Sequence, residues 1–246
     1  MIDFEKLRER KTAEADALGA VDIRNVRPSA RDFAYYVASD RKEVGVCVEL
    51  FRRDPYGSAI PEPLDYAALV REAEEVGALA IGVATDAELH GGSELDLALV
   101  GAAAAVPVLR IDYLVRENQL FRSRLLGADS AILHASLLDE RALAKLLEVG
   151  RHMRMECVVE AVDRDGIDRA IGAGARIVSV DARAPGADRA ELLAHAPAGA
   201  ILVARGGVET AADLRSLRGK ADAALVGAPF LSAPDPIEFL SALIES

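Results

Sequence analysis

Two carboxylates stand near the ends of apolar runs, where a buried side chain can do acid–base chemistry. Glu49 lies in "VGVCVEL", and Glu160 lies in "MECVVEA". Burial disfavours the charged form of a carboxyl group, so these positions predict a raised pKa and a role as general acid or base. The alternative for each is a carboxylate that pairs with an arginine such as Arg183 or Arg205 and does no chemistry. The residues alone leave both interpretations open.

Small residues follow the last two apolar runs and could hold a phosphate. Gly206 and Gly207 occur in "ARGGV", and Gly227 and Ala228 occur in "VGAP". Residues without a large side chain let a phosphate approach backbone N–H groups, and the loops after the last two strands of a barrel commonly do this. A tight turn is the alternative, but the two motifs together favour phosphate binding.

Histidines and cysteines give no pattern for a metal site or a strong nucleophile. Cys47 and Cys157 lie within apolar runs, as expected for buried free thiols in a reducing compartment. His134 interrupts an apolar run and is interpreted as a core residue. His90 precedes "GGS", where it either lines the mouth of a site or faces water. No two histidines have ligand spacing, so we predict no metal. We also predict no cofactor.

Eight apolar runs must position these residues. Each has the length of a strand that is buried on both faces, and helical segments with charged outer faces lie between them. The runs are 44–50, 78–84, 106–111, 129–135, 155–161, 176–182, 199–204 and 222–228. A strand and helix unit used eight times predicts an α/β fold, the (β/α)8 TIM barrel; an open doubly wound sheet is the alternative.

The chain of 246 residues is long enough for one such barrel. We predict a single domain, 1–246, with an N-terminal helical extension over 1–43 and the barrel over 44–246. The extension contains an amphipathic helix over 3–18 and a second helix over 27–38, entered from Pro28 and Ser29. These helices either close the bottom of the barrel or fold over its top and cover a ligand.

Charge and hydropathy narrow the class of partner. The net charge is −11, whereas nucleic acids and anionic membranes bind basic patches, so we predict neither as a partner. The charged start "MIDFEKLRER" has no apolar signal core, and no later apolar run avoids charge for long enough to span a bilayer. We expect a cytoplasmic protein that binds a small molecule; its oligomeric state is left open.

Over essentially the whole chain, the sequence resembles the indole-3-glycerol phosphate synthase family. The resemblance is carried by "VEL" with the following "P.G", "VPVLRIDYLVRENQ", "LGADSAIL", "VVEAVD", "AGARIVSVDAR", "VARGGV" and "LVGAPFL". It implies a barrel of tryptophan biosynthesis, a carboxy-lyase. That enzyme closes a carboxyphenylamino-deoxyribulose phosphate into indole-glycerol phosphate, releasing carbon dioxide and water. It also implies that the seventh and eighth loops hold the phosphate.

The departures from the family pattern fall on the site. Where the family has Glu-x-Lys-x-x-Ser-Pro, this chain keeps Glu49 but has Phe51 and Asp54. The third strand ends in "LRIDY", so that Ile111 replaces the lysine that the family uses as general acid. The fifth-strand glutamate is kept as Glu160.

Three further motifs of the family are matched in part by this chain. The family's Asn-x-Arg is Asp181 to Arg183, its Glu-Ser-Gly is Arg205 to Gly207, and its Gly-Ser is Gly227 and Ala228. A missing general acid typically lowers a rate by roughly 10² to 10⁴. We therefore expect weak or absent synthase activity.

Three hypotheses follow. In the first, the site is rebuilt for another phosphorylated ligand, with Glu160 and Glu49 as catalytic residues. The predicted substrate contacts are then Phe51, Asp54, Ile111, Asp181, Arg183 and Arg205. In the second, the barrel is non-catalytic and serves as a binding or regulatory protein partner. In the third, full synthase activity survives because Arg52, Arg53 or Arg110 replaces the lysines; arginine is a poor general acid, which disfavours it.

Overall fold

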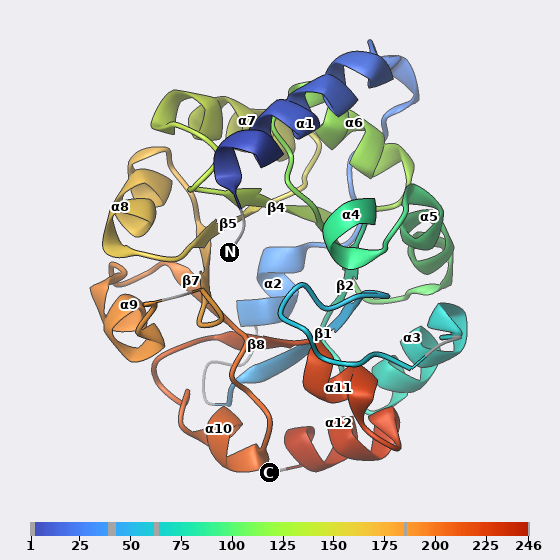
Figure 1. Ribbon diagram of the computed structural model, residues 1–246, viewed down its shortest axis with the longest axis vertical. Helices are drawn as coiled ribbons and strands as arrows, with labels where there is room; N and C mark the ends of the chain where they lie inside the picture. The colour runs from blue at the N-terminus through green and yellow to red at the C-terminus, as the bar shows by residue number, and fades with distance from the viewer. Residues whose placement is uncertain (1–2, 39–42, 62–63, 185, 246) are drawn as a thin grey trace.

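The computed structural model describes residues 3–38, 43–61, 64–184 and 186–245, and it is a closed barrel of parallel strands (Figure 1). The strands pair in chain order, and the last pairs with the first. They are β1 (Gly45–Leu50), β2 (Ile81–Ala84), β3 (Val108–Ile111), β4 (Ser130–His134), β5 (Val158–Ala161), β6 (Ile177–Asp181), β7 (Ile201–Arg205) and β8 (Ala223–Val226). Every strand lies within a predicted apolar run except for the last residue of β7, so the predicted TIM barrel is confirmed.

Helices surround the barrel and bury the outer faces of the strands (Figure 1). They are α3 (Tyr66–Glu75), α4 (Ala87–His90), α5 (Glu94–Ala103), α6 (Glu117–Leu125), α7 (Glu140–His152), α8 (Arg164–Gly172), α9 (Arg189–His195), α10 (Ala211–Arg215), α11 (Ala228–Ser232) and α12 (Pro236–Ile244). Many begin at an aspartate, serine or threonine whose side chain accepts a hydrogen bond from a backbone N–H of the first turn, as at Asp65, Ser93 and Thr210. Because both faces of the sheet are covered, the strands are almost continuously apolar.

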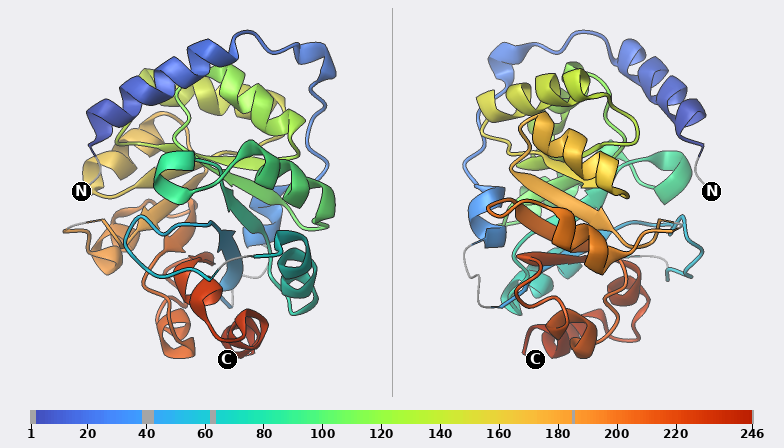
Figure 2. Two further views of the ribbon diagram at one scale, coloured as in Figure 1. Left: turned by 45° about the vertical axis from the view of Figure 1, so that its right-hand side comes forward. Right: turned by 90° about the vertical axis from the view of Figure 1, so that its left-hand side faces the viewer.

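The N-terminal helices lie at opposite ends of the barrel (Figure 2). Helix α1 (Phe4–Leu18) packs on α6 and lies over the carboxyl ends of the strands, whereas α2 (Phe33–Ala38) lies at the other end. A short 3-10 turn, η1 (Ile23–Asn25), lies between them. Both predicted placements therefore occur, one for each helix.

Helix α2 starts later than the sequence predicts. The hydroxyl of Ser29 accepts from the N–H of Arg31 and donates to Asp129, 2.7 Å away, so it holds a turn and does not cap a helix. Regular helix begins only at Phe33, which is buried together with Val37.

A buried lysine attaches α1 to the top of the barrel. Lys11 Nζ lies 2.6 Å from a carboxylate oxygen of Asp86 and 2.6 Å from one of Asp112, at the ends of β2 and β3. All three side chains are buried. Arg10 adds a second contact to Asp86 at 2.8 Å. Within the described ranges, no helix is long and apolar enough to cross a membrane.

Candidate active site

A buried arginine joins the two predicted catalytic carboxylates at the top of the barrel. Arg205 Nη1 donates to Glu160 Oε2 at 2.7 Å, and its Nε donates to Glu49 Oε2 at 3.1 Å. A further bond runs from Arg205 Nη2 to Glu49 Oε1. The three residues come from β5, β7 and β1, and all are buried. Of the two interpretations left open for these glutamates, the structure has the second, in which each pairs with an arginine.

This pairing reverses the expected pKa of both glutamates. Burial raises the pKa of Glu160, but the positive charge of Arg205 and hydrogen bonds from His134 and Arg205 outweigh it and hold the pKa well below its usual range. Burial likewise raises the pKa of Glu49, but the positive charge of Arg205 outweighs it, so that this pKa is also lowered. The prediction of raised pKa values was wrong, because it considered the burial of the two carboxyl groups and not their pairing with Arg205. Both groups are ionised at neutral pH.

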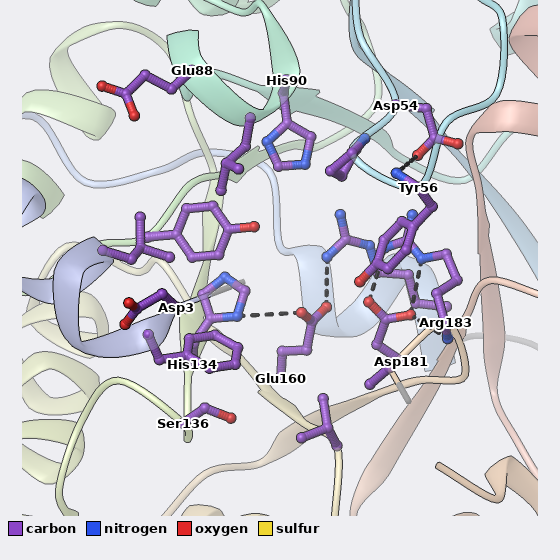
Figure 3. Close-up of a pocket in the computed structure, with 18 of the residues that line it drawn as sticks. Asp3, Asp54, Tyr56, Glu88, His90, His134, Ser136, Glu160, Asp181 and Arg183 are labelled. Carbon is purple, nitrogen blue, oxygen red and sulfur yellow. Dashed lines mark hydrogen bonds and ion pairs between the residues drawn. The ribbon is translucent and has the colours of Figure 1, made fainter. Parts of the chain in front are cut away.

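A second pair lies one strand away. Arg183 donates to Asp181 with Nε at 2.9 Å and Nη2 at 3.0 Å, and its guanidinium lies 4.8 Å from the ring centre of Tyr56. Tyr56 belongs to the loop after β1, which Asp54 shapes by accepting from the N–H groups of Tyr56 and Ser58, each at 3.1 Å. Asp54, Tyr56, Asp181 and Arg183 form one wall of the site in Figure 3.

A cavity of about 1080 Å³ opens above these residues. Helix α1 contributes Phe4, Lys6, Leu7 and Arg10 to its lining, so the helix covers part of the top of the barrel. Of the predicted site residues, the lining includes Asp54, Glu160, Asp181, Arg183 and Arg205.

Phe51 and Ile111 lie deeper than the cavity lining. Both are buried, with exposed fractions of 0% and 1%, and neither lines the cavity. A Cβ built on Gly227 would stand 2.6 Å from the Phe51 ring, and one built on Gly82 would stand 2.7 Å from Ile111 Cδ1. The two residues that replace the lysines of the family pattern thus fill the interior of the barrel.

The three arginines of the third hypothesis are separated in space. Arg52 pairs with Asp96, and Arg110 bonds Asp112 at 2.8 Å and Ser123 of α6 at 3.2 Å, on the outer side of the sheet. Arg53 lines the cavity, where its guanidinium donates to the carbonyl of Glu88.

The glycine loop after β7, for which phosphate binding is predicted, has arginines beside it. Gly206 and Gly207 have φ of 73° and 63°, values that favour glycine. The stem of Arg183 packs over Gly206, and Arg189 donates to the carbonyls of both glycines. Among the described residues, the N–H groups of these glycines have no acceptor.

Gly227 and Ala228 lie at the start of α11, where Gly227 packs against Phe51 and Glu49. None of the four predicted phosphate-binding residues lines the cavity itself.

The wall opposite Arg183 contains His90, for which lining the mouth of a site is one of the two predicted placements, and two ring residues that sequence reasoning missed, Tyr113 and His134. His90, Tyr113 and His134 all line the cavity, and the Tyr113 ring stacks on both histidines with ring centres 6.1 Å and 4.5 Å apart. His134 Nδ1 lies 3.2 Å from Glu160 Oε1 (Figure 3). The parallel register pairs His134 with Glu160, and this alignment of strand ends is the signal that would have found the pair.

This geometry, with charged and aromatic residues at the carboxyl ends of barrel strands beneath a covering helix, defines the chain as a (β/α)8 barrel with a candidate site at the carboxyl ends of its strands. The sequence profile of the indole-3-glycerol phosphate synthase family matches residues 3–243. The chain therefore belongs to the indole-3-glycerol phosphate synthase family.

Individual relatives agree with this assignment. The chain is 37% identical to the indole-3-glycerol phosphate synthase of Parafrankia sp. (strain EAN1pec), over 97% of this chain and 90% of that protein. It is 32% identical to the synthase of Chlorobium phaeovibrioides, over 84% of this chain and 83% of the relative. A monomeric form of phosphoribosylanthranilate isomerase from Thermotoga maritima shares the fold, with a TM-score of 0.59, 13% identity, and coverage of 82% of this chain and 97% of that one.

Proposed function

We propose that this barrel has a site rebuilt from that of indole-3-glycerol phosphate synthase, with weak or absent synthase activity, and that it binds a different phosphorylated small molecule. The observation that carries the proposal is the bonding of Arg205 to both Glu49 and Glu160. The resemblance places a glutamate at position 205 and lysines at positions 51 and 111. A single arginine therefore takes the place of the family's charge arrangement.

The chemical consequence concerns proton transfer. Phe51 and Ile111 have no exchangeable side-chain proton, so neither can act as the general acid of ring closure. Arg205 keeps its proton near neutral pH and is already bonded to two carboxylates. It therefore does not replace either lysine of the family pattern as a general acid. Losing a general acid costs roughly 10² to 10⁴ in rate, and losing a second positioning lysine adds to that without being strictly additive.

Support for a phosphorylated ligand comes from the loop after β7. The N–H groups of Gly206 and Gly207 have no acceptor among the described residues, and Arg183 and Arg189 lie against the same glycines. Oriented N–H groups and guanidinium groups are the donors that phosphate binds in proteins. Gly227 and Ala228 at the start of α11 supply small residues on the next strand.

A non-catalytic barrel that serves a protein partner is the second candidate, because the losses at positions 51 and 111 fit it equally well. The open cavity favours a small-molecule ligand, since a purely structural barrel has no need of a cavity of this size.

The experiment has two parts. The purified full chain is incubated with carboxyphenylamino-deoxyribulose phosphate, and formation of indole-glycerol phosphate is followed; calorimetry measures binding of the same compound and of inorganic phosphate. We expect binding with little or no turnover. Arg183→Gln should weaken phosphate binding by about 10- to 100-fold, since hydrogen bonds to charged groups contribute about 1.5–3 kcal/mol. Arg176→Gln, at the opposite end of β6, is the matched control and should bind normally.

Failure of both carboxyphenylamino-deoxyribulose phosphate and inorganic phosphate to bind would favour the non-catalytic alternative, and turnover at ordinary enzyme rates would refute the rebuilt site. A restoration variant sharpens the test. Because Arg205 holds both glutamates, Phe51→Lys with Ile111→Lys should give less activity than the triple variant that adds Arg205→Glu.

A further inference from the structure

His134 has one ring nitrogen engaged and one left without a partner. Its Nδ1 faces Glu160 Oε1 at 3.2 Å, whereas its Nε2 is buried and has no hydrogen-bonding partner among the described residues. Buried polar atoms are normally bonded, so such an atom in the lining of a cavity points to a group that a ligand supplies. His134 itself is buried and lines the cavity.

The partner on the other side decides which nitrogen holds the proton. Glu160 is ionised and accepts from Arg205 with its second oxygen, so it can only accept from His134. In the neutral imidazole, the proton therefore sits on Nδ1, and the unpartnered Nε2 of this cavity-lining residue carries the lone pair. The chain Arg205, Glu160, His134 orients a base in the way that a carboxylate orients a catalytic histidine.

Tyr113 lies beside this base as a neutral donor. Its ring stacks on that of His134, with centres 4.5 Å apart and an angle of 23° between the planes. Burial and nearby carboxylates, against the opposing charge of Arg205, raise the pKa of its hydroxyl well above the usual range. The hydroxyl therefore remains protonated at neutral pH and able to donate.

A base lone pair and a neutral hydroxyl on one wall match the needs of enolisation. We propose that His134 is a catalytic general base that removes a proton from the carbon next to the carbonyl of a phosphorylated α-amino or α-hydroxy ketone. The proposal rests on the proposed function, in which Arg183, a proposed phosphate contact that lines the same cavity, holds such a ligand near His134.

The step balances within the site. His134 Nε2 takes the proton, the electron pair of the broken C–H bond forms a C=C bond, and the carbonyl oxygen becomes an enolate oxygen that accepts a hydrogen bond from Tyr113. Return of a proton from the imidazolium to the same carbon restores the ligand. When the imidazolium exchanges its proton with heavy water before that return, the carbon acquires deuterium.

The test uses carboxyphenylamino-deoxyribulose phosphate, an α-amino ketone, with the full chain in heavy water. NMR and mass spectrometry follow deuterium uptake at the carbons next to the carbonyl. We expect uptake well above the rate without protein, and a loss of about 10²-fold or more in His134→Gln with unchanged affinity. Glu160→Gln, which changes a positioning residue, should lower the exchange rate without weakening the affinity. His152→Gln, on the exposed surface of α7, is the matched control.

The outcomes separate the two proposals. Binding without exchange by the unmodified protein would overturn the role of His134 and leave the proposed ligand class intact, and this result needs no variant to fold. Exchange that persists in a folded His134→Gln protein would also overturn the role. Failure of the compound and of inorganic phosphate to bind would overturn both proposals together.

Discussion

Replacing Arg205 by methionine should destabilise the protein strongly at neutral pH. The change removes the cation that bonds both Glu49 and Glu160 and leaves two carboxylates buried without it. Removing one partner of a buried ion pair typically costs about 3–5 kcal/mol, because the remaining charge stays out of water. For a chain of this size, 1 kcal/mol shifts the melting temperature by about 2–4 °C, so we expect a decrease of roughly 6–20 °C.

The pH dependence gives this prediction a second check. The pKa values of Glu49 and Glu160 are lowered in the folded protein, so their contribution to stability is present above the unfolded value of about 4.3 and is lost as the pH falls through the folded values. In Arg205→Met, burial without the cation raises both folded pKa values, and the carboxylates destabilise the fold above pH 4.3. The difference between the proteins should therefore be large at pH 7 and shrink toward pH 4.

The assay is thermal unfolding followed by circular dichroism at several pH values, with Arg53→Met as control. Arg53 also lines the cavity, but its guanidinium donates to a backbone carbonyl. A loss below about 1 kcal/mol in Arg205→Met, or a loss equal at pH 7 and pH 4, would refute the account of the pairing.

Two other predictions concern the attachment of α1 and the buried thiols. Lys11→Met leaves Asp86 and Asp112 without the ammonium group between them, so it should destabilise the protein by about 3 kcal/mol or more and make α1 susceptible to limited proteolysis. Burial raises the pKa of Cys47 and of Cys157 to about 12, so neither thiol should react with a thiol reagent at pH 8 until the protein unfolds.

Controls for these two experiments lie in the same chain. Lys6→Met removes an exposed lysine of α1 that pairs with Asp3, and it should leave stability and proteolysis nearly unchanged. Equal proteolysis of the Lys6 and Lys11 variants would contradict the proposed attachment. Rapid labelling of either cysteine in the folded protein would contradict its burial.

The barrel could be predicted from the sequence because each strand can be recognised from its own short apolar run. A run such as 176–182 has the apolar length of a doubly buried strand, and β6 lies inside it. Helix starts were less certain where a side chain had another partner. Ser29 resembles a helix cap in the sequence, yet its hydroxyl bonds Asp129, which is 100 residues away.

The positions of Glu49 and Glu160 at strand ends were also predictable, but their ionisation was not. Their common partner, Arg205, is separated from Glu49 by 156 residues, and only closure of the barrel brings the two together. The sequence predicts a core position for His134, because a lone histidine in an apolar run gives no sign of its neighbour. The register between β4 and β5 supplies that neighbour, Glu160.

The depth at which a side chain lies within the barrel was also not predictable from the sequence. Phe51 occupies a lysine position in the family pattern, which suggested a contact with substrate. Its ring instead fills the space beside Gly227, below the cavity. Sequence spacing gives the strand and the face, whereas the size of the facing residues decides how far a side chain reaches.

The central claim is that Arg205, Phe51 and Ile111 together make the site unsuited to the family's ring closure. The most direct measurement is the steady-state rate at which the unmodified protein converts carboxyphenylamino-deoxyribulose phosphate into indole-glycerol phosphate. We predict a rate at least about 10²-fold below that of a family member with both lysines, assayed alongside. A rate equal to that of the family member would contradict the claim.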